Sequence, residues 1–294
     1  MNPLLQLLEN GQPILLDGAM GTMLMDAGLE QGDPPDEWNV LYPERIKAIH
    51  RAYVDAGSQL ILTNSFGGTR FRLEMHNLQD RVYELNKAAA KNARSVSDDV
   101  QQTVVVAGDI GPTGQLFEPM GLLTFDDAVE AFAEQAKGLA DGGVDVLWIE
   151  TMSDINEVKA AIKGIRSVCD LPIVATMSFD THGHTMMGVS PANYIESLRE
   201  QDVIAVGANC GTGSDELEKT VQIMRETDPN VVLVAKGNAG IPHVVAGGDI
   251  VYDGSPELMA EYATNVRDIG ASLIGGCCGS TPDHIKAMAE ALGK

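Results

Sequence analysis

The sequence predicts a single (β/α)8 barrel, because eight short apolar runs recur along the chain with helical stretches between them. The runs are rich in β-branched residues and nearly continuous in apolar character, which is typical of parallel strands buried on both faces. No linker rich in Pro or Ser interrupts the series, so we expect residues 1–294 to form one domain. The same pattern also allows an open, doubly wound sheet made of two halves.

The predicted elements alternate in a regular order. The apolar runs lie at 13–17, 59–64, 103–108, 144–150, 172–178, 203–209, 231–236 and 271–276, and each is too short for a helix. Helices are predicted at 44–56, 80–98, 124–141, 153–168, 191–200, 214–227, 256–269 and 281–292. Several of them start with a capping residue before an acidic first turn, as at Thr124, Ser153 and Ser214. In such barrels the functional groups lie at the C-terminal ends of the strands, so the residues after each run are candidates for a site.

The composition limits the partners that the chain can have. Its 42 acidic and 20 basic side chains give a net charge of −22, which argues against nucleic acid and anionic membrane surfaces as partners. No apolar run reaches the roughly 20 residues that span a bilayer, and the first residues lack the features of a signal peptide. Four cysteines are too few for a disulfide framework in a chain of this length. We therefore expect a soluble protein of the reducing cytoplasm.

Three cysteines follow two of the predicted strands. Cys210 ends the sixth, and Cys277 and Cys278 follow the eighth, so a barrel would bring three thiols to one mouth. Three thiolates suit Zn²⁺ and leave a fourth position for substrate. Such an ion is suited to holding a fourth thiolate that attacks an electrophilic carbon, with alkyl transfer to sulfur. The alternatives are a reversible vicinal disulfide, or a metal-free binding barrel in which cysteines are small apolar side chains, the role expected of Cys169.

Glycine-rich and polar motifs also follow the predicted strands, from near residue 14 to near residue 292. They read LDGAMGT (16–22), ILTNSFGGTR (61–70), GDIGPTG (108–114), IETMS (149–153), GANCG (207–211), GNAGIP (237–242) and IGGCCGSTP (274–282). Together they resemble the homocysteine S-methyltransferase family, which includes betaine–homocysteine methyltransferase and the homocysteine module of cobalamin-dependent methionine synthase. The resemblance implies a (β/α)8 barrel, Zn²⁺ on Cys210, Cys277 and Cys278, and methyl transfer to L-homocysteine to give methionine.

By this resemblance, the loop after the first strand would hold the amino-acid end of homocysteine. Its backbone N–H groups can bind a carboxylate, and the Asp17 side chain, which is assigned a catalytic role, can pair with an ammonium. The alternative is that Gly18 and Gly21 only make a tight turn. The loop residues predicted to bind substrate are Asp17, Gly18, Ala19, Met20, Gly21 and Thr22.

Other residues at the predicted mouth are assigned roles in the same way. Glu150 is expected to be catalytic and to contact the homocysteine amino group or the methyl donor, with a salt bridge to Lys236 as the alternative. Asn238 resembles the position that can complete the zinc shell when homocysteine is absent. Asn64 and Ser65 also end a strand, where substrate contacts and ordinary hydrogen bonds of the rim are both open.

The methyl donor is the open part of the prediction. An onium donor such as glycine betaine needs aromatic or carboxylate groups around its cation. Trp38, in the loop after the first strand, would cover the pocket for such a donor, unless it is docked on the core. We expect betaine or a related onium compound, with S-methylmethionine or a methylcorrinoid on a partner protein as alternatives. The enzyme is also expected to form a homo-oligomer.

Overall fold

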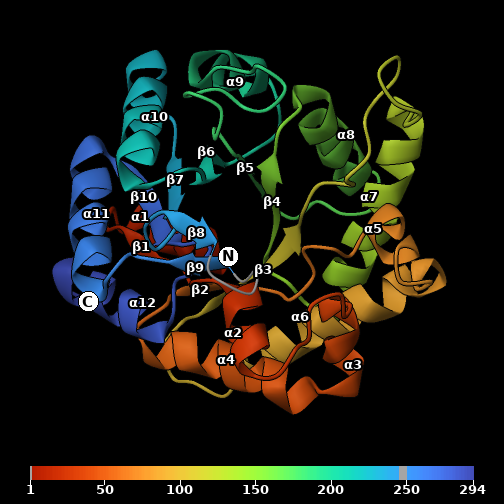
Figure 1. Ribbon diagram of the computed structural model, residues 1–294, viewed down its shortest axis with the longest axis horizontal. Coiled ribbons are helices and arrows are strands. Elements are labelled where there is room, and N and C mark those ends of the chain that lie inside the picture. Colours follow the sequence, from red (N-terminus) through yellow and green to blue (C-terminus); the bar gives the residue numbers. More distant parts are fainter. Residues whose placement is uncertain (1, 245–249) are drawn as a thin grey trace.

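Eight parallel strands form one sheet that closes on itself in a computed structural model, which describes residues 2–244 and 250–294. The strand order is β1-β10-β7-β6-β5-β4-β3-β2, and each neighbouring pair is parallel. A parallel bridge between Leu16 and Leu60 joins the two outermost strands. The chain is therefore a (β/α)8 barrel, as Figure 1 shows in a view along the barrel, and the doubly wound alternative is wrong.

Every predicted strand overlaps an observed one. Nearly all residues of the barrel strands are buried, which explains why the apolar runs are continuous rather than alternating. The barrel strands are β1 (Ile14–Leu15), β2 (Leu60–Leu62), β3 (Val105–Ile110), β4 (Val146–Met152), β5 (Ile173–Met177), β6 (Ala205–Cys210), β7 (Leu233–Gly237) and β10 (Ala271–Gly276).

The outer ring of helices also follows the prediction, with corrections at two starts. Thr124 caps its helix by accepting a hydrogen bond from the N–H of Asp127, as expected. The cap of the next helix is Asp154 rather than Ser153, and Ser214 is the first helical residue rather than the cap. The ring consists of α4 (Pro43–Asp55), α6 (Val82–Asp98), α7 (Phe125–Gly142), α8 (Ile155–Arg166), α9 (Pro191–Leu198), α10 (Ser214–Thr227), α11 (Pro256–Ile269) and α12 (Pro282–Ala291).

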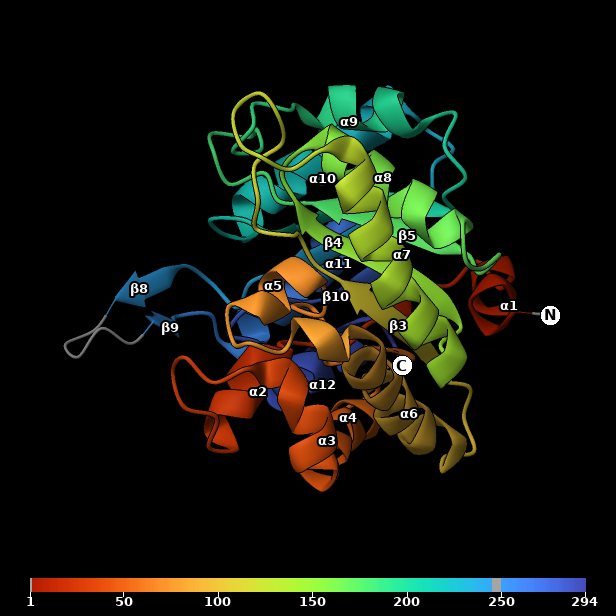
Figure 2. The same ribbon diagram turned by 90° about the vertical axis from the view of Figure 1, so that its right-hand side faces the viewer.

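Several short elements add to the predicted series, and all but η2, which overlaps the start of the predicted helix 80–98, were not predicted. Figure 2 shows the β8–β9 hairpin projecting from one end of the barrel and α1 lying at the other. Leu4 of α1 is fully buried and packs with apolar residues inside the barrel, so α1 closes that end. The elements are α1 (Pro3–Glu9), α2 (Met20–Asp26), η1 (Pro35–Glu37), α3 (Trp38–Leu41), α5 (Arg70–Glu74), η2 (Gln79–Arg81), β8 (Pro242–Val244) and β9 (Ile250–Tyr252).

Two apolar clusters fill the molecule and leave one end accessible. One cluster lies inside the barrel and includes Leu16, Leu62 and Trp148, whereas the larger one lies between the strands and the surrounding helices. Because α1 and the inner cluster fill the far end, a ligand can reach the strand ends only from the mouth. Among the described residues, no helix is both long enough and apolar enough to cross a membrane.

Candidate active site

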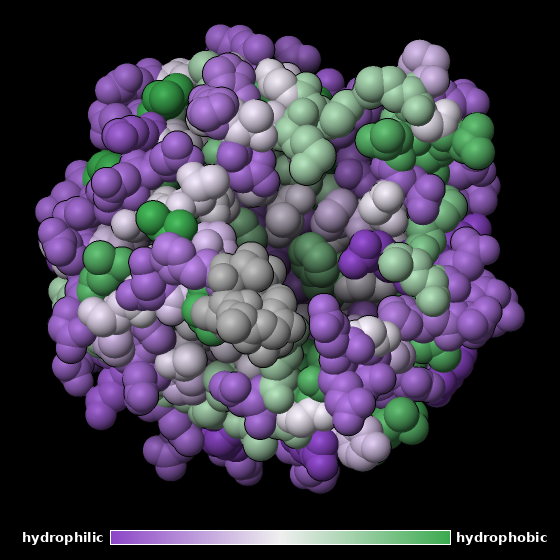
Figure 3. All heavy atoms as spheres, in the orientation of Figure 1, coloured by the Kyte–Doolittle hydropathy of each residue, from purple (hydrophilic) through white to green (hydrophobic). Residues whose placement is uncertain are grey.

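A cavity of about 410 Å³ lies at the C-terminal ends of the barrel strands. Figure 3 shows the corresponding hollow near the centre of this face, with mostly hydrophilic residues around the edge of the molecule. Two of the predicted site residues, Trp38 and Asn238, are not among the residues that line the cavity. The predicted residues that do line it are Asp17, Gly18, Ala19, Met20, Gly21, Thr22, Asn64, Ser65, Glu150, Cys210, Cys277 and Cys278.

The three predicted cysteines meet at this cavity. Their sulfur atoms all lie within 4.8 Å of one another, with Cys210 Sγ 2.9 Å from Cys277 Sγ and 3.9 Å from Cys278 Sγ. Cys210 ends β6 with a φ of 59°, a left-handed conformation that L-residues rarely adopt. Gly279, with a φ of 76°, turns the chain just after the adjacent pair. These two turns direct side chains from separate strands to one point.

The chemistry of the donor set fits a metal ion. A tetrahedral Zn²⁺ with thiolate ligands at about 2.3 Å places its sulfur atoms about 3.8 Å apart, close to the spacing of Cys210 and Cys278. Hydrogen bonds from Cys210 and Cys277 lower the pKa of Cys278 to about 3, so the cluster already favours one thiolate. Cys169, the remaining cysteine, lies outside the cluster and is partly packed against the core.

Asn209, next to Cys210, links the cysteine cluster to the neighbouring strands through its side-chain amide. Its Oδ1 accepts hydrogen bonds from the Thr151 N–H at 2.9 Å and from the Thr176 hydroxyl at 2.6 Å. These bonds leave the Asn209 amide NH₂ facing the Thr151 hydroxyl at 2.7 Å and the Cys210 sulfur at 3.5 Å. The sequence places Asn209 at a strand end, but the sulfur contact depends on the meeting of three strands.

Asn238 joins the two loops that carry the cysteines. Its side-chain NH₂ donates to the Gly211 carbonyl at 2.8 Å, and its Oδ1 accepts from the Cys278 N–H at 3.1 Å. The side chain is buried, and both of its polar ends are used in these contacts. In this structure Asn238 therefore positions the loops, and its role in a metal shell stays a prediction.

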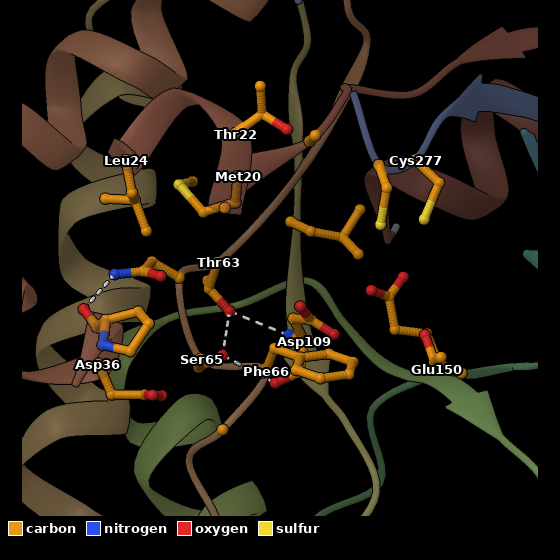
Figure 4. A pocket seen from close by; sticks show the side chains of 18 of the residues that line it. Met20, Thr22, Leu24, Asp36, Thr63, Ser65, Phe66, Asp109, Glu150 and Cys277 are labelled. Carbon is orange, nitrogen blue, oxygen red and sulfur yellow. Dashed lines mark hydrogen bonds between the residues drawn. The ribbon is translucent and has the colours of Figure 1, made fainter. Parts of the chain in front are cut away.

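A buried group of charges lies beside the cysteines. Lys236 Nζ is 2.8 Å from Glu150 Oε2, so the salt bridge considered as an alternative role for Glu150 is present. Asp17 and Asp109 are also buried, and each has an Oδ1 without a partner among the described residues. Burial raises the pKa of Asp17 to about 7, although Lys236 opposes the shift. Three carboxylates around one ammonium can accept a further cation, and Figure 4 shows Glu150 on the same side of the cavity as Cys277.

The loop after β1 is held in place by the loop after β10. The Ala19 N–H donates to the Ser280 hydroxyl at 3.1 Å, and the Tyr53 hydroxyl donates to the Ala19 carbonyl at 2.9 Å. Thr22 Oγ1 accepts from the Gly279 N–H, so this hydroxyl supports the cysteine turn. A Cβ on Gly18 would lie 2.7 Å from Ser280 Oγ, so only glycine fits here.

The polar residues after β2 mainly hold other parts of the mouth. Asn64 Nδ2 donates to the Pro35 carbonyl at 2.8 Å, and the Ser65 hydroxyl donates to the Asp109 carbonyl at 2.7 Å. The Thr63 hydroxyl lies 2.6 Å from Ser65 Oγ and accepts from the Asp109 N–H. These contacts favour the rim hydrogen bonds over substrate contacts for the side chains of Asn64 and Ser65.

Trp38 lies in the core rather than over the cavity. It is in α3, 5% exposed, and its ring contacts Tyr42 with centroids 4.9 Å apart. The Arg45 guanidinium covers the same ring at 5.1 Å. Phe66 is instead the aromatic residue of the cavity wall. The sequence shows a tryptophan in the first loop but not the turn that carries it away from the mouth.

The fold and the site together define a family. The family model for homocysteine S-methyltransferase matches residues 14–292, so the chain belongs to the homocysteine S-methyltransferase family. It is similar to the homocysteine methyltransferase MmuM from Escherichia coli, at 25% identity over 98% of this chain and 99% of that one, with a TM-score of 0.81 for the metallated form. The oxidized form of that protein gives 25% identity, 99% of both chains and a TM-score of 0.82. A methyltransferase from Methanosarcina mazei shares the fold, at 11% identity over 96% and 93% of the two chains, with a TM-score of 0.61.

Proposed function

We propose that this enzyme is a zinc-dependent homocysteine S-methyltransferase that forms methionine from L-homocysteine and a small onium donor. The observation that carries the proposal is the convergence of Cys210, Cys277 and Cys278 within 4.8 Å at the cavity. These residues would hold Zn²⁺, which supplies the chemistry of deprotonating a fourth thiol at neutral pH while leaving it nucleophilic. The E. coli relative is known in a metallated form, which supports a bound metal in this chain as well.

The buried charged residues can bind the amino group of homocysteine. Asp17, Asp109 and Glu150 present three carboxylates to one ammonium, that of Lys236, so an incoming amino group finds unpaired acceptors. The backbone around Ala19, fixed by Ser280 and Tyr53, would hold the rest of the amino acid. Rigid support of this kind fixes the thiolate sulfur for in-line attack.

The transfer itself is a substitution at carbon. The homocysteine thiolate attacks the donor methyl carbon, a C–S bond forms, and the bond from that carbon to the onium atom breaks. The electron pair of the broken bond stays on the donor, which leaves as a neutral amine or thioether, and the thiol proton goes to solvent. Phe66 and the surrounding carboxylates suit a cationic methyl group, so betaine or a related onium compound is favoured. S-methylmethionine or a methylcorrinoid on a partner protein is the alternative donor.

The thiol cluster also bears on where the enzyme works. Three cysteines within 4.8 Å bind a metal only while they stay reduced, so we place the protein in a reducing compartment such as the cytoplasm. Assembly as a homo-oligomer is a further part of the proposal.

The test is an assay of methionine formation from homocysteine with a panel of donors, combined with metal analysis. The panel consists of betaine, dimethylsulfoniopropionate, S-methylmethionine and methylcobalamin. We expect about one zinc per chain, with loss of both metal and turnover in Cys277→Ala and retention of both in Cys169→Ala. Full zinc content and activity in Cys277→Ala would refute the proposal. Loss of two thiols on oxidation, with no metal bound, would favour the redox alternative instead.

A further inference from the structure

Two oppositely charged residues that pair with no described side chain line the cavity, and one of them, Asp36, lies on the side opposite the cysteines (Figure 4). Asp36 in η1 is 5% exposed, lines the cavity, and has an Oδ1 with no hydrogen-bond partner among the described residues. Arg72 in α5 also lines the cavity, and its guanidinium makes no hydrogen bond or ion pair with any residue that the structure describes. The Arg72 charge acts on the Asp36 carboxyl, but the two groups are not in ion-pair contact. A buried charge without a partner is costly unless something binds to it.

The backbone that carries Asp36 is firmly held. Asn39 Nδ2 donates to the Asp36 carbonyl at 2.8 Å and to the Asn64 carbonyl at 2.7 Å. Asn64 Nδ2 donates to the carbonyl of Pro35, the preceding residue. On its other side the carboxylate lies against Gly67, where a Cβ would be 2.8 Å from Asp36 Oδ2. Asp36 is thus fixed in place with one oxygen free, as in a preorganised binding site.

The barrel topology puts these charges across the cavity from the thiols. Arg72 follows β2 and Cys210 ends β6, and the two strands are four apart in a closed barrel of eight. Figure 4 likewise shows Asp36 and Cys277 on opposite sides of the cavity. The cavity wall also contains the apolar residues Met20, Leu24, Phe66 and Leu73, together with the polar residues Thr63 and Ser65. The cavity therefore has charged groups on the cysteine side and a second pair of charged groups on the opposite side.

We propose that Asp36 and Arg72 form a second charged subsite, which binds the non-reacting end of a zwitterionic methyl donor. Asp36 faces a cationic group of that end, and Arg72 faces its carboxylate. The proposal rests on the proposed function and narrows its donor class to compounds with a charged tail. In the proposed function, homocysteine is bound by other carboxylates, those of Asp17 and Asp109, which line the cavity and each have an Oδ1 without a partner among the described residues.

Charge-removing variants of nearly the same shape test this assignment. In Asp36→Asn and Arg72→Met, the KM for S-methylmethionine is expected to rise roughly tenfold or more, because each loses a charge-assisted contact. The KM for homocysteine and the zinc content should not change. Trimethylsulfonium has no charged tail, so its KM should be the same in the wild type and both variants. Betaine has a carboxylate but no second cation, so its KM should rise in Arg72→Met and stay unchanged in Asp36→Asn. Glu37→Gln is the matched control, because Glu37 adjoins Asp36 but pairs with Arg81 at 2.6 Å outside the cavity.

The outcomes separate this subsite from the proposed function. Unchanged donor constants in both variants, or a raised KM for homocysteine instead, would overturn the subsite and leave the methyltransferase proposal standing. If no donor is turned over, calorimetric titration of the zinc-loaded protein with S-methylmethionine tests whether the subsite binds this compound. Binding that is weakened by Asp36→Asn but not by Glu37→Gln supports the subsite although the proposed function fails. Absent or unaffected binding overturns the subsite as well.

Discussion

The ammonium of Lys236 lies 2.8 Å from the carboxylate of Glu150, and the two side chains are only 4% and 10% exposed. Lys236 → Met would leave Glu150 buried without its partner beside Asp17 and Asp109. We expect the free energy of unfolding at pH 7 to fall by about 3–5 kcal/mol, measured by urea denaturation. Lys163→Met breaks an exposed pair with Asp126 and should leave the midpoint nearly unchanged. Equal losses in the two variants would contradict a buried role for the Lys236 pair.

Asn209 should matter for metal affinity rather than for folding alone. Asn209→Ala removes the amide that faces the Cys210 sulfur and is fixed by Thr151 and Thr176. Residues that orient metal ligands typically change affinity by about 10–100-fold, and we expect a loss in that range. Competition with a chelator measures it. Asn265→Ala, whose amide pairs with Glu218 instead, is the control, and an equal effect there would contradict the assignment.

His50 makes the stability of the protein depend on pH. It is fully buried, neither ring nitrogen has a partner among the described residues, and burial lowers its pKa from 6.5 to about 4. The unfolded chain therefore binds the proton more readily, so this contribution is complete above about pH 6.5 and is lost as the pH falls toward 4. The full effect is about 3 kcal/mol.

The variant His50→Leu isolates this effect. Asp17 and Asp36 have a raised pKa of about 7, so their contribution has the opposite sign and is lost as the pH rises. Both proteins retain these groups, and the comparison cancels them. Urea denaturation at pH 7.5 and pH 5 should show that acidification changes the free energy of unfolding less favourably in the wild type than in His50→Leu. Equal changes in the two proteins would show that His50 is not the sensitive group.

Two glycines of the loop after β1 differ in the space around them. A Cβ on Gly18 would lie 2.7 Å from Ser280 Oγ and 2.8 Å from Tyr53 Cε1, whereas one on Gly21 meets nothing within 4 Å. Gly18→Ala should therefore lower the free energy of unfolding by about 1–3 kcal/mol through overpacking. Gly21→Ala lies within α2, where alanine is favoured, and should not lower it. Thermal denaturation measures the stability of both variants. An equal loss of stability in Gly21→Ala would show that overpacking at Gly18 is not the cause.

The barrel and the thiol cluster could be predicted from sequence because both follow from regular features. Continuous apolar runs mark strands buried on both faces, and closure of the barrel then brings Cys210 and Cys277 to one mouth. The family match over residues 14–292 agrees with the motifs after each strand. Neither feature depends on the orientation of an individual side chain.

The Asp36 side of the cavity could not be predicted because it depends on side-chain direction in irregular segments. Trp38 and Asp36 are two residues apart, yet the first packs in the core and the second faces the cavity. The helical turn between them decides this, and no hydrophobic period marks so short an element. Asp36 and Arg72 come from the separate loops after β1 and β2, so their meeting at one cavity depends on the path of both loops.

The Asp17 carboxylate takes part in closing the barrel as well as in lining the cavity. Its Oδ2 accepts the Leu62 N–H at 2.7 Å, next to the bridge between Leu16 and Leu60 that joins β1 to β2, while its Oδ1 has no partner among the described residues. A ligand cation at the free oxygen would anchor the very group that fastens these two short strands. Ligand binding in the cavity and separation of β1 from β2 are thus linked. Local opening between these two strands should therefore be less frequent in the ligand-bound protein than in the free protein.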